Sequence, residues 1–392
     1  MKNAIILTGN KYPNGDAGAL RQQSIAKILQ HLGYTVMIYG MGEYTSNSIK
    51  ENDGVLYTSL RGHNNSRLCR IKDRLTWGSR AFKQIKKSYN KIDVLIVVDD
   101  NPLIFKKAEK ISKLFNCILI HDCVEWYSPD EFKFGKLSIQ YNLKNHINTK
   151  SINSKWSVIS ISSYLEEWFI SRAKRTVTIP VILNMSDVEL NYENRESNRT
   201  LKIVYAGAPG KKDSLNHIIE GFSALNKNEL NRVELHIIGV TKEQLVKNCN
   251  VESVFIDKMG KSLYVHGRIP HAEAVEWVKK ADYTVLLRNN ELRYAKAGFP
   301  TKIVESLKYG TPPICNLSSD LNKYLLDKNN SIIIDGYNSN SVTDAIKKAL
   351  SISEDEYMFM RKNARETAMK SFDYRKYINA LSFLLEITEK EQ

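Results

Sequence analysis

The sequence predicts an α/β protein with two doubly wound units, each a parallel sheet covered by helices on both faces. Three observations support this prediction. Short apolar runs alternate with amphipathic segments of helix length, a pattern typical of parallel strands joined by helical crossovers. The chain has 392 residues, too many for one compact α/β domain and enough for two. The polar segment 191–200 has no apolar periodicity, and the same pattern restarts after it, so we interpret it as an interdomain linker.

We expect an N-terminal domain at 1–190, a C-terminal domain at 191–370 and a final helix at 371–392 that packs back toward the N-terminal domain. The first domain opens on a strand, followed by a helix from Ala19 to Leu32 with one apolar face. Gly33 ends this helix, because glycine adopts a left-handed conformation without strain. The strands expected in this half are 4–7, 35–39, 94–98, 118–120 and 158–161.

The second half repeats the alternation. Pro270 is expected at the first position of a helix that runs to Lys280, where its missing N–H costs nothing. The tail from Ser341 is expected to be helical in three pieces. The expected strands are 201–205, 233–238, 263–266, 283–287, 313–315 and 332–334, with further helices at 214–225 and 301–309.

Composition excludes several classes of protein. Hydrophobic residues make up 42% and charged residues 26%, which is typical of a globular chain and not of a disordered one. The longest apolar runs are far too short to span a membrane, and no signal peptide is expected because the N-terminus enters a strand directly. The five cysteines have no metal-type spacing. We therefore expect buried thiols of a reducing, cytoplasmic compartment, without disulfides or a zinc site.

The charge balance indicates an anionic partner. Lys and Arg number 57 against 43 Asp and Glu, a net charge of +14. Segment 61–91 concentrates this excess, since Asp73 is its only acid, and its apolar residues recur at helical spacing. Such a helix suits the anionic inner face of a cell membrane, and Trp77 favours this interfacial role. The alternative is a solvated helix packed on its own domain. Nucleic acid is not expected, because no recognised binding module is present.

The segment from Tyr283 to Cys315 is predicted to form a strand, a polar loop, a helix beginning at Thr301 and a second strand. A loop that leads into a helix presents unpaired N–H groups to an anion, and the helix dipole adds to the attraction. Glu305 is a lone carboxylate one turn into this helix. The layout suits a nucleotide-sugar, with N–H groups for the diphosphate and a carboxylate for the ribose. The alternative is an ordinary strand–loop–helix with a solvated Glu305.

Several stretches in order resemble the GT-B glycosyltransferases, most closely the retaining, metal-independent family four that includes bacterial polysaccharide-assembly enzymes. The stretches are TGNKYPNGDAGALRQQSIAKILQHLGYTVMIYG, LKIVYAGAPGKKDSLNHIIEGFSAL, VELHIIG, LYVHGRIPHAEAVEWVKKADYTVLLR and AGFPTKIVESLKYGTPPICN. The resemblance implies two Rossmann-like domains that face a cleft, with C-terminal helices. It implies transfer of a hexosyl or related sugar from a nucleotide-diphosphate donor to a glycan or lipid-linked acceptor, with retention of configuration and without a metal or other cofactor.

The family's acidic motif has two glutamates eight positions apart around a Gly-Phe loop. Glu305 matches the second, which contacts the donor ribose, and the first falls on Ala297. The N–H groups of Gly298 and Phe299 are expected to remain available to the donor, together with Thr301. The sugar contact of the missing glutamate is left open between Lys296, Arg293 and Glu291.

The family also grips the donor phosphates with an Arg and a Lys after the first strand of this half. Lys212 matches the Lys, and the Arg position falls near Ala208. Arg288, at the end of a strand, is the expected substitute, because a planar guanidinium binds a diphosphate in a bidentate manner. The alternatives are a solvated Lys212 and an Arg288 paired with Glu291 or Asp282. Gly207 and Gly210 are expected to let the backbone approach the nucleotide.

In the N-terminal half, Gly15 and Gly18 flank a loop that in the family closes over the transferred sugar, and Arg21 is expected to face the cleft. His121 matches a family position near the reacting carbon, and Glu125 is a second acceptor-side candidate. The alternative for His121 is a core histidine.

In the implied mechanism, cations and helix-end N–H groups stabilise the departing diphosphate, whose oxygen takes the acceptor proton. No Asp-x-Asp motif lies beside the donor elements, and Asp99 to Asn101 is interpreted as a helix cap. Because two family positions are unmatched, a non-catalytic binding or scaffolding subunit remains the alternative function. A dinucleotide oxidoreductase is disfavoured because the full G-x-G-x-x-G fingerprint is absent.

Overall fold

The structure is a computed structural model that describes residues 2–13, 17–42, 48–60, 67–186, 188, 200–208 and 212–386, apart from the side chains of 67, 68 and 70. It divides into two compact units. Unit 1 comprises Met1–Asn184 and Asp373–Gln392, and unit 2 comprises Met185–Phe372. Gly15, Gly210 and nearly all of the expected linker lie outside the described residues.

Unit 1 contains an eight-stranded sheet with the order β3-β4-β2-β1-β5-β6-β7-β8. Neighbouring strands are parallel except for β3 and β4, which are antiparallel. The strands are β1 (Lys2–Thr8), β2 (Tyr34–Gly40), β3 (Lys50–Asn52), β4 (Val55–Ser59), β5 (Val94–Val98), β6 (Ile118–Cys123), β7 (Trp156–Ser160) and β8 (Thr176–Thr178). The helices include α1 (Ala17–His31), α2 (Arg67–Ser88), α3 (Pro102–Phe115), α4 (Ile139–His146) and α5 (Ser163–Phe169), with single turns η1 (Pro129–Glu131), η2 (Gly135–Leu137) and η3 (Ile147–Ser151).

The end of the chain completes the core of unit 1. After the turn η6 (Tyr374–Tyr377), helix α15 (Ile378–Leu385) places Leu381 and Leu384 in the same apolar cluster as Ile25 and Leu29 of α1. Because these leucines are at most 2% exposed, the last described helix contributes to the folding of unit 1 through buried apolar surface.

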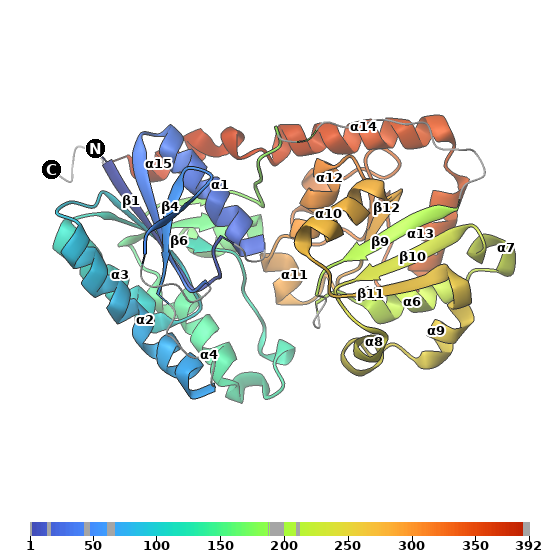
Figure 1. Cartoon of the computed structure of the whole chain (residues 1–392), viewed down its shortest axis with the longest axis horizontal. Coiled ribbons are helices and arrows are strands. Elements are labelled where there is room, and N and C mark those ends of the chain that lie inside the picture. The colour runs from blue at the N-terminus through green and yellow to red at the C-terminus, as the bar shows by residue number, and fades with distance from the viewer. Residues whose placement is uncertain are drawn as a thin grey trace. The chain divides into compact units, whose positions relative to one another are not determined.

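Unit 2 contains a six-stranded, fully parallel sheet with the order β11-β10-β9-β12-β13-β14. Its strands are β9 (Leu201–Ala206), β10 (Val233–Ile238), β11 (Leu263–Gly267), β12 (Tyr283–Leu286), β13 (Pro313–Cys315) and β14 (Ile332–Ile333). Helices α10 (His271–Lys280) and α12 (Thr301–Lys308) cover one face, and α6 (Leu215–Ser223) and α13 (Ser339–Ser351) lie on the other (Figure 1). The remaining elements are α7 (Lys227–Leu230), α8 (Lys242–Cys249), α9 (Ser253–Met259), η4 (Gly260–Ser262), α11 (Arg293–Ala297), η5 (Leu321–Lys323) and α14 (Glu354–Ser371).

The strand order of unit 2 determines where a ligand is expected. The chain builds outward from β9 through β10 to β11 and then returns to start β12 on the other side of β9. In doubly wound sheets, ligands bind at the carboxyl ends of the two strands that flank this reversal. The segments after β9 and β12 are therefore the first place to look for a site.

Most elements expected from the sequence are confirmed, including the helical tail in α13, α14 and α15. Strands β3, β4 and β8 were not expected. Strands β3 and β8 have only three residues each and lie at the edges of their sheet. Pro270 caps α10 one position before the place expected for it. None of the helices in the described ranges is long and apolar enough to cross a membrane.

The interfacial role expected for Trp77 is wrong. Its side chain is 2% exposed, and α2 packs on α3 through this part of its surface. A Cβ added to the adjacent Gly78 would lie 2.5 Å from Cδ1 of Ile104, which shows how closely the two helices approach. The apolar stripe of α2 is therefore used at this position for packing within unit 1.

Gly239 tests how tightly the carboxyl edge of the unit 2 sheet is packed. It has φ +109°, and an added Cβ would lie 2.3 Å from the carbonyl oxygen of Gly207. We expect Gly239→Ala to lower the free energy of unfolding by about 3 kcal/mol, through backbone strain and displacement of the loop after β9. Gly260→Ala is the matched control, since Gly260 has φ +51° but open space around it, and about 1 kcal/mol is expected. Urea unfolding measures both, and equal losses would contradict the close packing.

Candidate functional site

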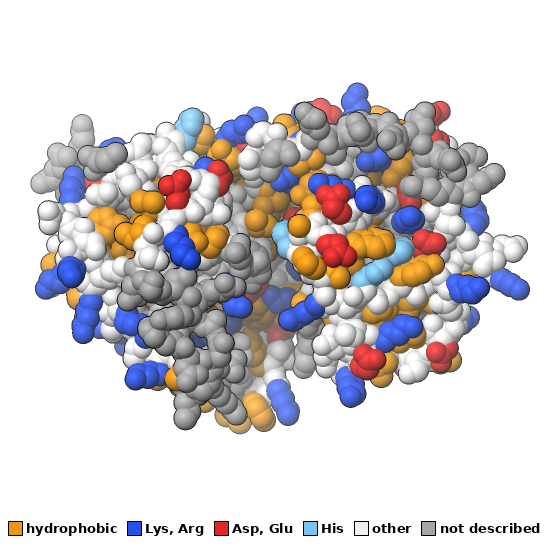
Figure 2. All heavy atoms as spheres, viewed as in Figure 1, with side chains coloured by type: hydrophobic (Ala, Val, Ile, Leu, Met, Phe, Trp, Pro, Cys, Tyr) orange, Lys and Arg blue, Asp and Glu red, His pale blue; other side chains and the backbone are white. Residues whose placement is uncertain are grey.

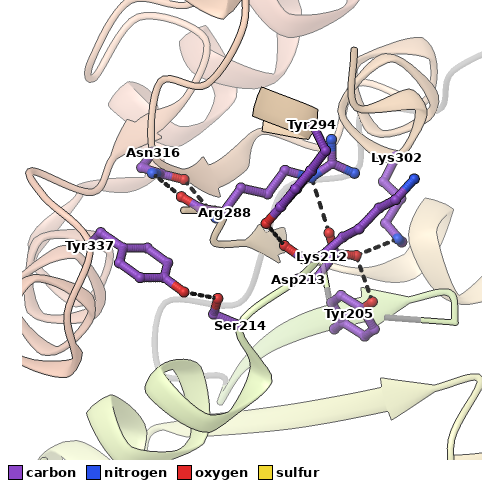
Figure 3. A network of polar contacts seen from close by, with 9 residues as sticks. All are labelled: Tyr205, Lys212, Asp213, Ser214, Arg288, Tyr294, Lys302, Asn316 and Tyr337. Atoms are coloured by element: carbon purple, nitrogen blue, oxygen red, sulfur yellow. Dashed lines mark hydrogen bonds and ion pairs between the residues drawn. The ribbon is translucent and has the colours of Figure 1, made fainter. Parts of the chain in front are cut away.

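A buried carboxylate lies at the centre of a polar cluster in unit 2, and Figure 3 shows its contacts. Asp213 follows the loop after β9, and its side chain is 1% exposed. Its Oδ1 accepts a hydrogen bond from Nε of Arg288 at 3.0 Å, and its Oδ2 accepts from Nζ of Lys302 at 2.6 Å and from the hydroxyl of Tyr205 at 2.8 Å. Residues from β9, from the segment after β12 and from α12 thus meet at one carboxylate.

Arg288 is held in place through its own backbone. It follows β12 and forms an antiparallel bridge with Asp213. The side-chain amide of Asn316, after β13, accepts from the N–H of Arg288 at 3.0 Å and donates to its carbonyl oxygen at 2.7 Å. Asn316 is 4% exposed, so this clamp is shielded from water. The backbone from which the guanidinium extends is therefore held in place at the carboxyl edge of the sheet.

Lys302 enters the cluster from the first turn of α12. Hydrogen bonds of the Ser306 hydroxyl to Thr284 of β12 and to the carbonyl of Thr311 fix this helix on the sheet, at 2.6 Å each. The ammonium lies 5.2 Å from the centre of the Tyr205 ring, and 26% of the side chain is exposed. A cation in the first turn opposes the helix dipole. An anion bound beside Lys302 would explain why a lysine occupies this position.

Glycines allow the strands and α12 to approach at this point. Gly207 has φ +142°, and an added Cβ would lie 2.2 Å from Cε of Lys302. Any larger residue after β9 would displace the lysine. The backbone of Gly207 therefore lies against the Lys302 side chain. Helix α12 begins without a side-chain cap for its N–H groups.

The pKa shifts agree with a charged Asp213. Burial alone would raise the pKa of this carboxyl, but Lys302 and Arg288 and the hydrogen bonds it accepts lower it below its usual range. Burial and then the Asp213 charge raise the pKa of the Tyr205 hydroxyl well above its ordinary value. Tyr205 therefore stays a neutral donor.

The cluster has a positive balance. Lys212 precedes Asp213, and its carbonyl accepts from the hydroxyl of Tyr294 at 2.5 Å. Two cations, Arg288 and Lys302, pair with the single carboxylate Asp213, which leaves an excess of one positive charge among these contacts. This excess, next to the starts of α6 and α12, suits an anion.

Glu305 lies one turn after Lys302 on α12 and is half-buried. Burial raises the pKa of its carboxyl, and the nearby His271 and Lys302 lower it only in part. Among the described residues its side chain makes no hydrogen bond or ion pair. A carboxylate in this position is able to accept hydrogen bonds from the hydroxyls of a ligand.

The structure places the other expected donor residues as follows. Gly298 ends α11, and its N–H donates to the carbonyl of Tyr294 at 2.9 Å, so the expectation that this N–H is available to a ligand is wrong. Phe299 packs against Phe372 and Tyr324 with ring centres 5.7 and 5.9 Å apart. Thr301 is the first residue of α12.

The remaining donor candidates are also accounted for. Ala297 is fully buried, so the position of the family's first glutamate belongs to the core here. Lys296 and Glu291, two of the open candidates for the sugar contact, pair with each other at 3.7 Å on the surface. Arg288 pairs with Asp213 and not with the partners considered for it, Glu291 and Asp282.

Two of the candidates of unit 1, Arg21 and His121, lie in its interior. Arg21 is 4% exposed, and its guanidinium binds both oxygens of Asp122 and the carbonyls of residues 179 and 180. His121 is 4% exposed, with Nδ1 3.1 Å from the carbonyl oxygen of Val97, and burial lowers its pKa. Glu125 is half-exposed and lies 3.9 Å from Nζ of Lys144. Gly18 is the second residue of α1. A catalytic role for His121 and Glu125 stays a prediction.

Sequence reasoning missed the central residues of the cluster. The sequence does not predict Asp213, Lys302 or Asn316 as residues of the site. The one available signal was Lys302, since a lysine in the first turn of a helix is unfavourable for the helix itself. Within the described ranges, no group of three or more His, Cys, Asp and Glu side chains is arranged to hold a metal ion.

Comparisons with known proteins identify the fold of the chain. Residues 189–367 match the family model of glycosyl transferases group 1. The sucrose-phosphate synthase from Thermosynechococcus elongatus has a TM-score of 0.73 at 14% identity, with 98% of each chain covered. Anabaena Alr3699/HepE, solved in complex with UDP and glucose, has a TM-score of 0.69 at 14% identity, with 98% of this chain and 99% of that chain covered. WaaG, a glycosyltransferase involved in lipopolysaccharide biosynthesis, has a TM-score of 0.69 at 12% identity, with coverage of 97% and 99%.

The chain has the GT-B fold. This confirms the fold class expected from the sequence. At such identities the likeness concerns the fold, and no curated protein sequence matches the chain. Within the GT-B fold, the segment that matches the family model contains the whole Asp213 cluster and Glu305.

Asp213→Asn tests whether the carboxylate organises the cluster. We expect it to lower the free energy of unfolding by about 3 kcal/mol at pH 7, because two largely buried cations lose their counter-charge. Since the pKa of Asp213 is lowered in the folded state, its contribution is present above the unfolded pKa and is lost as pH falls through the folded pKa. The difference between variant and wild type should therefore stay constant from about pH 7 to about pH 5 and shrink as pH falls from about 4 to about 2. Urea unfolding across this range measures it, with the exposed Asp344→Asn as control, and a difference that is constant over the whole range would contradict the account.

Proposed function

We propose that the protein is a glycosyltransferase that moves a sugar from a nucleotide-diphosphate sugar to a glycan or lipid-linked acceptor. The observation that carries this proposal is the positive cluster around Asp213 at the switch point of unit 2. The family model over residues 189–367 and the GT-B fold support it. The UDP and glucose bound to Anabaena Alr3699/HepE indicate a uridine nucleotide as the first donor to test.

In this proposal the diphosphate lies against Arg288, Lys302 and Lys212. Arg288 is fixed by the Asn316 clamp, and Lys302 by the docking of α12 on β12, so both charges are in place before the donor binds. Negative charge on the diphosphate grows as the bond to the sugar breaks. Fixed cations stabilise this developing charge, which lowers the barrier without the help of a metal ion.

Glu305 is proposed to bind the donor ribose. Its carboxylate lies one turn beyond Lys302 on the same helix, so a ligand with its diphosphate at the helix start has its next group within reach. The absence of a hydrogen-bond partner for this half-buried carboxylate among the described residues supports the assignment.

Retention of configuration, with the acceptor proton passing to a diphosphate oxygen, is part of the proposal and rests on the resemblance to family four. A transferred hexose and a polysaccharide or lipid-linked acceptor rest on the same resemblance. His121 and Glu125 are proposed on the acceptor side, where Glu125 has the more exposed side chain. The proposed location is the cytoplasm, with peripheral contact to the inner face of the membrane.

Lys302→Gln tests the diphosphate contact. We expect wild-type protein to bind UDP in calorimetry and the variant to bind about 10-fold more weakly or less, because one charge-assisted contact is lost. Lys279→Gln is the matched control, since Lys279 lies near the end of α10 and pairs with Glu276. If the two variants bound every nucleoside diphosphate equally well, Lys302 would not belong to the site.

Glu305→Ala tests the ribose contact. We expect it to raise the donor KM by about 10-fold or more or to abolish transfer, with unchanged urea unfolding, because the variant cannot accept hydrogen bonds from the ribose hydroxyls. Glu305→Gln, which keeps the acceptor oxygen, should lose less. The assay measures donor hydrolysis and sugar transfer over a panel of nucleotide-sugars. Wild-type turnover in Glu305→Ala would remove Glu305 from the site.

A further inference from the structure

Three hydrogen-bonded side chains of unit 2 form a chain that the proposed reaction does not use. Glu234 and His236 lie on β10, and His266 lies next to the last residue of β11. Oε2 of Glu234 is 3.2 Å from Nε2 of His236, and Nδ1 of His236 is 3.1 Å from Nε2 of His266. The two imidazole planes differ by only 13°, with ring centres 5.4 Å apart. A direct hydrogen bond between the two rings therefore links β10 to β11.

The carboxylate determines where the protons of this chain lie. A carboxylate only accepts hydrogen bonds, so Nε2 of His236 carries the proton that Glu234 accepts. In a neutral ring the other nitrogen is then an acceptor, and Nε2 of His266 donates to Nδ1 of His236. One added proton, at Nδ1 of His266, leaves this bond intact. A second, at Nδ1 of His236, places two N–H groups and two positive rings against each other, and the bond is lost.

Aromatic rings cover the histidine pair. His236 is 4% exposed, and the ring of Tyr264 stacks on it with centres 4.6 Å apart. The ring of Trp277, from α10, lies 4.7 and 4.5 Å from the centres of the two imidazole rings. Figure 2 shows histidine among hydrophobic side chains on unit 2, where Figure 1 draws β10, β11 and α10. The pair is largely removed from water, which disfavours charge on either ring.

Charged groups on three elements act on the pair among the described residues. They are Glu234 on β10, Lys202 on β9 and Glu273 on α10. Burial is the largest cause that lowers the pKa of each histidine, and the neighbouring glutamates offset it only in part. Both rings are therefore mainly neutral at about pH 7, and they take up protons below the ordinary value of about 6.5.

The pair lies at a bulge that is connected to the proposed donor site. The pairing of β10 with β11 skips His266, so β11 has one extra residue at this point. Gly267 follows with φ +69°, and its carbonyl accepts from the N–H of Gly239 at 2.6 Å. The backbone of Gly239 lies against that of Gly207, which in turn lies against the Lys302 side chain. A change at the bulge therefore reaches a cation of the site through a short series of direct contacts.

We propose that the chain of Glu234, His236 and His266 positions the edge of the donor site and releases it in acid. With the chain intact, the bulge of β11 holds the backbone of Gly239 and Gly207 in place beside Lys302. When both histidines are protonated, the chain breaks, the bulge rearranges and nucleotide affinity falls. His266 is thus a positioning residue that does not touch the ligand. The inference rests on the proposed function for its ligand, whereas the effect of protons on the sheet edge does not.

Calorimetric titration of the full chain with UDP at about pH 7.5 and about pH 5 tests the proposal. We expect the affinity of wild type to fall at least about 5-fold more between these values than that of His266→Gln. Glutamine keeps a donor at the position of Nε2 and, by turning its amide, also accepts from a protonated His236, so the chain persists at both values. Protonation of UDP itself affects all variants equally. His31→Gln, at an exposed position of α1, is the control and should follow wild type.

His266→Ala removes the chain at every pH. It should bind UDP at least about 5-fold more weakly than wild type already at about pH 7.5. Urea unfolding tests the proton uptake without a ligand. Because the pKa of both histidines is lowered in the folded state, their contribution to stability is present above the unfolded value of about 6.5 and is lost as pH falls toward the folded values. The urea midpoint should therefore fall more in wild type than in His266→Gln.

Two binding results would overturn the proposal. One is an equal pH dependence of UDP affinity in wild type and His266→Gln, and the other is a folded His266→Ala variant that binds UDP as wild type does. If wild type bound no nucleoside diphosphate at either pH, the proposed function would fail, and the urea midpoints would decide about the chain. A steeper loss in wild type than in His266→Gln would then support the proton-sensitive chain, and equal losses would overturn it.

Discussion

The contact between Asp213 and its cations determines the arrangement of the proposed site. A carboxylate that is 1% exposed is costly to bury unless charged and polar partners surround it. Arg288 and Lys302, which lie 75 and 89 positions after Asp213 in the sequence, supply these partners. The ion pairs that offset the free-energy cost of burying Asp213 also hold two cations at the edge of the sheet. Stability and the capacity to bind an anion therefore have a common origin.

The fold determines where the cluster lies, and two glycines allow its segments to approach each other closely. The switch point of the unit 2 sheet places the segments after β9 and β12 side by side. Gly207 and Gly239 then let the backbone after β9, the end of β10 and Lys302 come into contact. Side chains at either glycine would separate these segments. Glycine is therefore required at these two positions because the segments that carry the cations approach each other closely there.

Much of the fold was predictable from the sequence because it depends on local patterns. The alternation of apolar runs with amphipathic helices identified both units. Motifs and strand ends led to the prediction of Glu305, Lys212 and Arg288 as donor contacts. The partner of Arg288 was not predictable, because only the folded sheet brings Asp213 next to it. Trp77 and Gly298 were predicted incorrectly for the same reason. The sequence context indicated an exposed Trp77 side chain and a Gly298 N–H available to a ligand. In the structure Trp77 packs against α3, and the Gly298 N–H is bonded within the end of α11.

The central claim is that fixed cations, without a bound metal ion, hold a diphosphate beside Asp213. The most direct measurement is calorimetric titration of the full chain with uridine, UMP and UDP in the presence of a chelator. The account predicts that UDP binds at least about 10-fold more tightly than UMP and that uridine binds more weakly still, because each added phosphate meets fixed positive charge. Equal affinities for the three ligands, or UDP binding that appears only when a divalent metal ion is added, would contradict it.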